Sequence, residues 1–187
     1  MAITSFHTKY FAHELTKRSP SYSIEKLTGT LSQAQIDVNP HQVDAALFAF
    51  KSPFSKGAIL ADEVGLGKTI EAGLVIAQKW AERKRKIIIV TPAHIRKQWS
   101  QELQEKFFIP SKILETKSFN QARKDKKNPF LDNDSLIICS HQFAKKYEYE
   151  ISKISWDLAV IDEAHRLRNV YLPTNRIGNA IKNALSH

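Results

Sequence analysis

The sequence predicts an α/β domain in which a mostly parallel sheet is flanked by helices. Short apolar runs rich in β-branched residues alternate with segments of helical periodicity. Strands separated by helices of this length pair in parallel through right-handed crossovers. The unbroken run at residues 86–90 is typical of a strand covered on both faces. With 187 residues, of which 42% are hydrophobic, the chain is long enough for one domain with a sizeable core.

The order of the elements follows from periodicity and from breaker residues. Residues 1–38 are polar with scattered aromatic residues, and we expect a small helical N-terminal extension there, interrupted at Pro20. Pro173 suits a helix start, and the turn pair Asn128-Pro129 ends a polar basic stretch over 117–128. We expect helices over 41–50, 69–83, 93–107 and 173–185, and strands over 57–61, 86–90, 112–114, 136–139 and 158–161.

Composition limits the class of protein. The net charge of +9 and the pI of about 9.6 favour a polyanionic partner such as nucleic acid, although a basic surface can also simply confer solubility. Cys139 is the single cysteine and lies in an apolar run, which predicts a buried structural residue rather than a reactive thiol. No apolar run approaches the roughly 20 residues that span a bilayer, and the N-terminus shows no secretion signal. We therefore expect a cytoplasmic protein with no membrane partner.

A glycine-rich segment joins the strand expected at 57–61 to the helix expected at 69–83. Glycines there allow backbone N–H groups to approach phosphate oxygens, and a helix N-terminus adds favourable partial charge. Lys68 would reach the β- and γ-phosphates of ATP, and the Thr69 hydroxyl would bind Mg²⁺. The alternative is an ordinary turn followed by a surface lysine, since Asp62 stands where the strict phosphate-loop pattern has glycine. The nucleotide-binding segment would comprise Asp62, Glu63, Val64, Gly65, Leu66, Gly67, Lys68 and Thr69.

Two carboxylates follow the strand expected at 158–161. Ligands of open α/β sheets bind at the carboxyl ends of the strands, where the glycine-rich segment also emerges. Asp162 would hold Mg²⁺ through water, and Glu163 would orient and deprotonate the attacking water. His165 would sense the γ-phosphate or couple the site to another surface. Taken alone, an Asp-Glu pair after a strand is also a common helix start.

Together these motifs resemble motifs I and II of superfamily 2 helicases, specifically the Swi/Snf group of DNA-dependent ATPases. In that group the loop typically begins with Asp-Glu, so Asp62 fits the family, and 162–165 is similar to its Asp-Glu-Ala-His motif. The string over 61–73 is most similar to the bacterial branch that includes the RNA-polymerase-associated Swi/Snf ATPase. Residues 39–42 resemble the upstream Q-type motif, which would place Gln42 near the adenine.

Two further motifs resemble the family's nucleic-acid-tracking face. Residues 88–99 are similar to motif Ia and residues 137–141 to motif Ib, and hydroxyl and basic groups suit phosphate contacts. The alternatives are that these hydroxyls cap helices and that the basic pair is a solvated face. Trp99 is interpreted as a core residue, and the basic run 83–86 as a solvated loop. The candidate phosphate contacts are Thr91, Arg96, Lys97, Ser140 and His141.

The resemblance implies that residues 39–187 form a RecA-like lobe 1 that stops before motif III, with the second lobe absent. It implies ATP hydrolysis, with ATP and Mg²⁺ as cofactors, coupled to movement on double-stranded DNA, possible association with RNA polymerase or another complex, and a cytoplasmic, nucleoid-associated location. Since an arginine finger contributes about 10³ to 10⁵ in rate, we expect this polypeptide alone to be nearly inactive. The alternatives are a restriction or phage-defence motor, an unwinding helicase, or a non-catalytic nucleotide-binding module.

Overall fold

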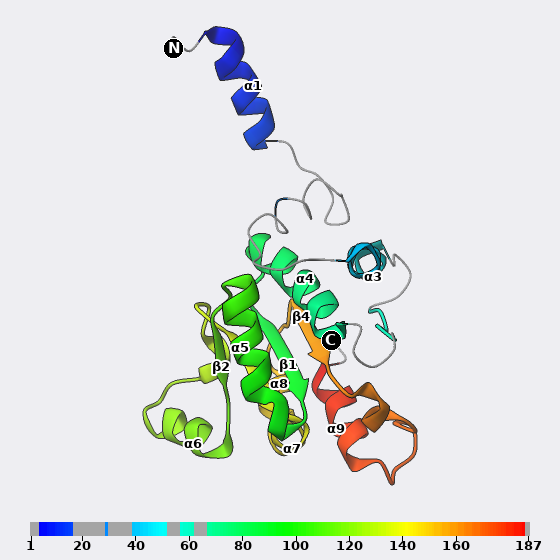
Figure 1. Cartoon of the computed structure of the whole chain (residues 1–187). Coiled ribbons are helices and arrows are strands. Elements are labelled where there is room, and N and C mark those ends of the chain that lie inside the picture. Colours follow the sequence, from blue (N-terminus) through cyan, green and yellow to red (C-terminus); the bar gives the residue numbers. More distant parts are fainter. Residues whose placement is uncertain (1–3, 17–28, 30–38, 52–56, 62–66, 186–187) are drawn as a thin grey trace.

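A parallel sheet of four strands organises the domain in the computed structural model, which describes residues 4–16, 29, 39–51, 57–61 and 67–185 (Figure 1). The strands are β1 (Ile87–Thr91), β2 (Ser111–Ile113), β3 (Leu136–Ser140) and β4 (Leu158–Ile161), and their order is β2-β3-β1-β4. Every neighbouring pair is parallel, which confirms the α/β fold class predicted from the sequence.

Strand β1 lies between β3 and β4 and is covered on both faces. Its residues Ile87 to Val90 are fully buried, as the unbroken β-branched run predicts. Ile89 lies between Ile138 of β3 and Val160 of β4 in the ladder. This register brings the carboxyl ends of β1, β3 and β4 to one edge of the sheet.

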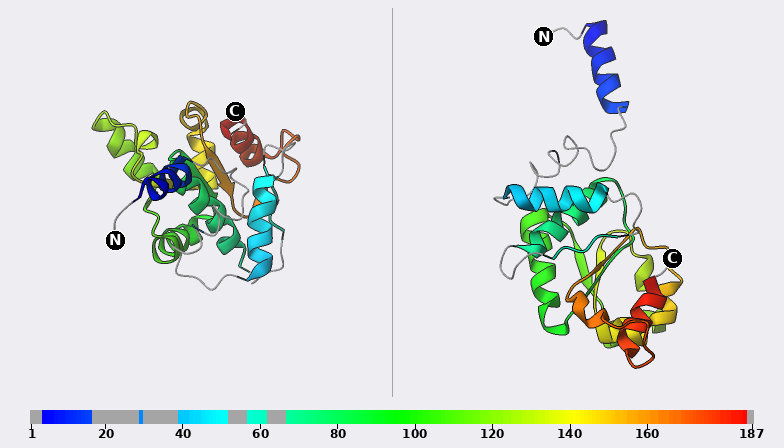
Figure 2. Two further views of the ribbon diagram at one scale, coloured as in Figure 1. Left: turned by 90° about the horizontal axis from the view of Figure 1, so that it is seen from above. Right: turned by 90° about the vertical axis from the view of Figure 1, so that its right-hand side faces the viewer.

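Helices cover the two faces of the sheet (Figure 2, right). Ala46, Leu103 and Phe107 belong to one buried cluster, on the face covered by α3 (Pro40–Lys51), α4 (Lys68–Ala81) and α5 (Arg96–Phe107). Phe119 and Ile151 belong to a second cluster, on the opposite face. The helices that contribute to that second cluster are α6 (Thr116–Lys124), α7 (His141–Lys146), α8 (Glu148–Ser152) and α9 (Arg176–Leu185).

One further helix and three short turns are described outside the sheet and its covering helices. Helix α1 (Ser5–Thr16) lies away from the sheet in Figure 1, and the side chains of residues 4–13 are exposed. Single 3-10 turns occur at η1 (Ala93–Ile95), η2 (Pro129–Leu131) and η3 (Ala164–Leu167). Asn128 caps η2 through its side chain, so the turn expected at Asn128-Pro129 is confirmed.

The strand expected over 57–61 is wrong. Residues 57–61 have no regular structure, Ile59 is 82% exposed, and only Leu60 packs against the core. A short apolar run becomes a strand only where a neighbouring strand takes up its hydrogen bonds, and none of the described strands pairs with it. The last helix begins at Arg176 rather than at Pro173, which lies in a preceding turn. The polar basic stretch over 117–128, for which no helix was expected, contains most of α6.

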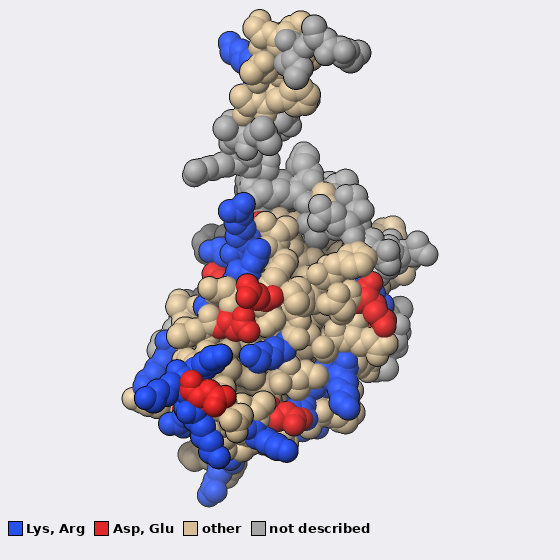
Figure 3. All heavy atoms as spheres, turned by 90° about the vertical axis from the view of Figure 1, so that its left-hand side faces the viewer, with Lys and Arg blue, Asp and Glu red and all other residues tan. Residues whose placement is uncertain are grey.

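Basic residues are concentrated on the side of the molecule that carries α6. Figure 3 shows Lys and Arg gathering over the lower part of this side, where α6 lies. Arg123 pairs with Glu150 of α8 at 3.5 Å, and Asp125 is the one acid in residues 116–127. The remaining exposed bases of this stretch form what we call the α6 basic surface: Lys117, Lys124, Lys126 and Lys127.

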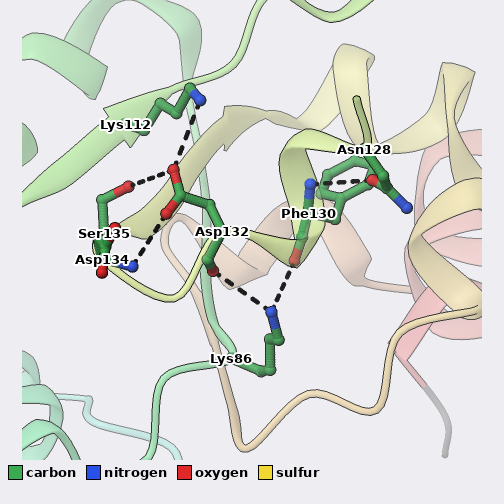
Figure 4. Close-up of polar contacts among 7 residues, drawn as sticks. All are labelled: Lys86, Lys112, Asn128, Phe130, Asp132, Asp134 and Ser135. Carbon is green, nitrogen blue, oxygen red and sulfur yellow. Dashed lines mark hydrogen bonds and ion pairs between the residues drawn. The ribbon is translucent and has the colours of Figure 1, made fainter. Parts of the chain in front are cut away.

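The amino ends of the strands are held by a separate polar cluster (Figure 4). Lys86 Nζ donates to the carbonyl oxygens of Phe130 at 3.3 Å and Asp132 at 3.4 Å. The backbone N–H of Asp134 donates to the Asp132 carboxylate and, with Lys112 nearby, holds the pKa of Asp132 below its usual value, against the opposing effect of burial. This cluster ties the η2 segment to the sheet at the edge opposite the candidate site.

Candidate functional site

Asp162 follows β4 directly, and its carboxylate accepts hydrogen bonds from β1, from α5 and from the next residue of the chain. Its Oδ2 accepts from the Thr91 hydroxyl at 3.1 Å and from the indole Nε1 of Trp99 at 2.8 Å. Its Oδ1 accepts from the backbone N–H of Glu163 at 2.8 Å. A carboxylate offers about four acceptor positions, so these three bonds fix its orientation and leave room for one further donor, such as a water molecule.

The backbone of Asp162 is held as well. Its N–H donates to the Val90 carbonyl at 2.9 Å, and its own carbonyl lies 3.1 Å from Nε2 of His141. A carbonyl only accepts, so Nε2 carries the proton of this imidazole. Burial, with a contribution from the positive charge of Arg166, holds the pKa of the fully buried His141 below its usual value. His141 is therefore a neutral donor that positions the strand end.

The start of α4 is shaped by Gly67. Gly67 adopts a left-handed conformation, with φ of 89°, and a Cβ at this position would collide with the side-chain amide of Gln42. Gln42 is buried, and its Oε1 accepts from the backbone N–H of Asn39 at 3.1 Å. The structure thus places the Gln42 side chain against Gly67, at the end of the glycine-rich segment. Contact of Gln42 with adenine stays a prediction.

Thr69 and Asp162 line the same small pocket. The other residues that line it belong to α5 and η1. The donor types suit Mg²⁺, which binds oxygen ligands and keeps several waters. Trp99 was interpreted as core alone, and it is both core and a hydrogen-bond donor to Asp162. Nothing in its sequence context marks this second contact. The pocket is lined by Thr69, Ile95, Gln98, Trp99, Glu102 and Asp162.

Glu163 and His165 form an exposed pair that follows Asp162 in the chain. His165 Nδ1 lies 2.9 Å from Oε2 of Glu163, and about half of each side chain is exposed. Glu163 has φ of 53°, a left-handed conformation that costs a non-glycine residue roughly 1 kcal/mol or more and that recurs at functional sites. The chain therefore turns sharply directly after Asp162, and the paired side chains of Glu163 and His165 are open to solvent.

The remaining nucleotide candidates divide by whether the structure describes them. Lys68 is the first residue of α4, on the same helix turn as Thr69. Residues 62–66, which are Asp62, Glu63, Val64, Gly65 and Leu66, lie outside the described residues. Their contact with a nucleotide stays a prediction.

The candidate phosphate contacts lie in different environments. Thr91 and His141 are fully buried and bonded to Asp162, so neither is accessible to a polyanion in this structure. The Ser140 hydroxyl accepts from the Phe143 N–H and caps α7, which was the alternative interpretation. Arg96 and Ser140 line a second pocket, and Lys97 is exposed on α5. Phosphate binding by these five residues stays a prediction.

Comparison with known proteins decides the family. The model of the SNF2-related domain matches residues 16–184. The chain belongs to this family. The match begins inside the 1–38 segment, and the domain boundary at residue 39 stays a prediction.

Similar proteins agree with this assignment. The chain is 37% identical over 132 residues to the RNA polymerase-associated protein RapA of Yersinia pseudotuberculosis (serotype O:1b, strain IP 31758), covering 68% of this chain and 13% of that protein. It is 36% identical over 132 residues to RapA of Serratia proteamaculans (strain 568), with the same coverage. The chain therefore spans about an eighth of the length of these curated relatives.

A solved structure shares the fold. The Sulfolobus solfataricus SWI2/SNF2 ATPase core in complex with dsDNA matches with a TM-score of 0.65 and 20% identity, over 81% of this chain and 30% of that chain. At this identity the match supports the RecA-like fold.

In the part of the chain that the structure describes, no helix is long and apolar enough to cross a bilayer.

Proposed function

We propose that residues 39–187 form the nucleotide-binding lobe of an SNF2-type motor that hydrolyses ATP and moves on double-stranded DNA. The observation that carries this proposal is the pocket shared by Thr69, from the first turn of α4, and Asp162, from the end of β4. Two parts of the chain 93 positions apart in sequence (162 minus 69) thus present a hydroxyl and a carboxylate to one small volume. Family membership supports the same interpretation.

Different side chains would contact the metal ion, the phosphates and the adenine of the nucleotide. The Thr69 hydroxyl would bind Mg²⁺ directly, and Asp162 would hold it through water, because three of the acceptor positions of its carboxylate are already used. When bound, the metal ion would neutralise charge on the phosphate oxygens. Lys68 would contact the β- and γ-phosphates, with the backbone of 62–67 around them. Gln42 would lie at the adenine side.

The exposed pair of Glu163 and His165 would act on the attacking water molecule. Glu163 would accept a proton from the attacking water as general base. His165, 2.9 Å from its carboxylate, would orient Glu163 and respond to the γ-phosphate. In the present geometry this carboxylate is engaged by the imidazole, so Glu163 would have to exchange His165 for water before hydrolysis.

The proposed track is duplex DNA, contacted through Arg96, Lys97 and Ser140, with Thr91 and His141 as further candidates if the Asp162 network opens. The net charge of +9 suits a polyanion. The relative RapA is an RNA polymerase-associated protein, and the Sulfolobus ATPase core is in complex with dsDNA. We accordingly propose RNA polymerase or a similar complex as partner, and a cytoplasmic, nucleoid-associated location.

ATP hydrolysis by the protein in its complete natural form, with and without duplex DNA, tests the proposal. We expect DNA to stimulate hydrolysis and Lys68→Ala to abolish it, while Lys182→Ala on the exposed face of α9 leaves it unchanged. An equal rate of ATP hydrolysis with and without duplex DNA would favour another kind of motor or a helicase. Nucleotide binding without any hydrolysis would favour a non-catalytic module.

A further inference from the structure

A second pocket lies between α5, α6 and α7, away from Thr69 and Asp162. Its volume is about 280 Å³, enough for a phosphodiester group. It lies beyond the carboxyl ends of β2 and β3, the strands that lead into α6 and α7. Its lining residues are Arg96, Glu115, Thr116, Ser140, Gln142, Phe143 and Lys146.

The lining is rich in hydrogen-bond donors. Arg96 is held in place because its Nε donates to the Ala93 carbonyl at 3.0 Å, and its side chain is only 16% exposed. The Ser140 hydroxyl accepts from the Phe143 N–H and so keeps its own proton to donate. Two cations, two hydroxyls and an amide in one pocket form a donor set suited to an oxyanion.

One acid faces these donors. Glu115 is the single carboxylate of the pocket lining, and its Oε1 lies 3.0 Å from Nη2 of Arg96. The Glu115 side chain is 57% exposed, so water or an anion reaches this pair readily. The chain's own Glu115 carboxylate is therefore paired with Arg96, the cation that the Ala93 carbonyl holds in place.

The charge around the pocket selects a polyanion. Thr116 and Lys117 are consecutive, so the α6 basic surface begins at the pocket rim, and Figure 3 shows the basic side chains over this part of the molecule. A polyanion gains from such a surface because each neutralised phosphate releases counterions. A small free anion would gain little from lysines beyond the pocket.

We propose that this pocket takes one phosphate of the nucleic-acid backbone, with Lys146 and Thr116 as contacts beside Arg96, and that Glu115 is a built-in competitor which the phosphate displaces. The proposal rests on the DNA-binding part of the proposed function. Binding here is an exchange of anions: the Arg96–Glu115 pair opens, and the phosphate takes the place of the carboxylate. The pocket charge of Arg96, Lys146 and Glu115 sums to +1, and Glu115→Gln raises it to +2.

Salt-dependent binding of duplex DNA to the protein in its complete natural form tests the exchange. The variants are Glu115→Gln, Arg96→Ala, the two combined, and Glu105→Gln, which makes the same charge change on the exposed face of α5. Glu115→Gln should tighten binding about tenfold. The slope of log K against log salt should change little, because the unaltered protein and Glu115→Gln hold the same phosphate in the complex. Glu105→Gln should leave the affinity nearly unchanged.

The double variant separates displacement from a general charge effect. In the Arg96→Ala background, Glu115→Gln should lose most of its effect, since the competitor then has no partner to release. An equal effect of Glu115→Gln with and without Arg96, or equal effects of Glu115→Gln and Glu105→Gln, would overturn the proposal. If the unaltered protein fails to bind duplex DNA, the proposed function fails as well, and that outcome is distinct from wild-type binding with no response to Glu115→Gln.

Discussion

The indole of Trp99 donates to the same carboxylate oxygen of Asp162 that accepts the hydroxyl of Thr91, at 2.8 Å and 3.1 Å. Trp99 is 4% exposed and belongs to the core under α5. The position of the candidate metal-binding carboxylate is therefore tied to the packing of a core helix. A shift of α5 would reorient Asp162, so the packing of this helix is connected directly to the pocket that Thr69 and Asp162 line.

Trp99→Phe should weaken Mg²⁺-dependent nucleotide binding while the protein remains folded. The substitution keeps an aromatic ring in the core but removes a hydrogen bond to a carboxylate, worth about 1.5–3 kcal/mol. Trp156→Phe is a matched control, because it removes a comparable indole bond of 3.1 Å to the Ile151 carbonyl, on another part of the fold. Thermal unfolding should show a loss of stability for both variants, and calorimetry with Mg²⁺-ATP a loss of affinity for Trp99→Phe alone. Equal affinities would show that the indole does not position Asp162.

Gly67→Ala should destabilise the protein by more than 1 kcal/mol. The left-handed φ of Gly67 disfavours any Cβ, and the added methyl group would also collide with the Gln42 amide. Gly57→Ala serves as the control, because no atom lies within 4 Å of a Cβ there. Chemical denaturation should show that a second change, Gln42→Ala, recovers the part of the loss that comes from the collision and leaves the part that comes from φ. Full tolerance of Gly67→Ala would contradict the observed conformation.

The stability of the fold should fall as the pH drops below about 6.5. Burial foremost, and the charge of Arg166, lower the pKa of His141 in the folded state, while the nearby Asp162 opposes the shift. The unfolded chain then binds a proton that the folded chain does not, so the free energy of unfolding decreases between the ordinary histidine value of about 6.5 and the lower folded value. The slope for one proton reaches at most about 1.4 kcal/mol per pH unit.

His141→Gln should remove this dependence and should also lower stability at pH 8, where the bond to the Asp162 carbonyl is altered. Denaturation curves between pH 5 and 8 measure both effects, with His94→Gln as a control for an exposed imidazole. A pH dependence in His141→Gln as steep as in the unaltered protein would assign it to other groups.

The sequence predicted the features that neighbouring residues determine, and it missed those that depend on contacts between residues far apart in the chain. Strand β4 was predicted at its observed bounds because an apolar run between Asp157 and Asp162 marks both ends locally. The strand expected over 57–61 has the same kind of local pattern, yet pairing depends on a partner that the pattern cannot specify. Helices α7 and α8 have six and five residues, too short for a periodic signal.

The site shows the same division. The types and order of Lys68, Thr69 and Asp162 are visible in the sequence, and the shared pocket brings Thr69 and Asp162 together. The contact between Trp99 and Asp162 depends on how α5 packs beside β4, and no local pattern records that. Sequence similarity placed Thr91 and His141 on a nucleic-acid face, but both are buried. Thr91 lies in the ladder opposite Ser140, and His141 contacts the Asp162 carbonyl, and no local pattern records either contact.

Calorimetric titration of ATP with and without Mg²⁺ tests the central claim, the joint Mg²⁺-nucleotide site of Thr69 and Asp162, most directly. The comparison is between the unaltered protein in its complete natural form, Asp162→Asn, and Asp134→Asn at the opposite edge of the sheet. Asparagine at 162 still offers an oxygen to Trp99 and Thr91, so the fold should be kept. Mg²⁺ should tighten ATP binding in the unaltered protein and in Asp134→Asn, and Asp162→Asn should lose at least about tenfold of that gain. An undiminished effect of Mg²⁺ in Asp162→Asn would contradict the assignment of the site.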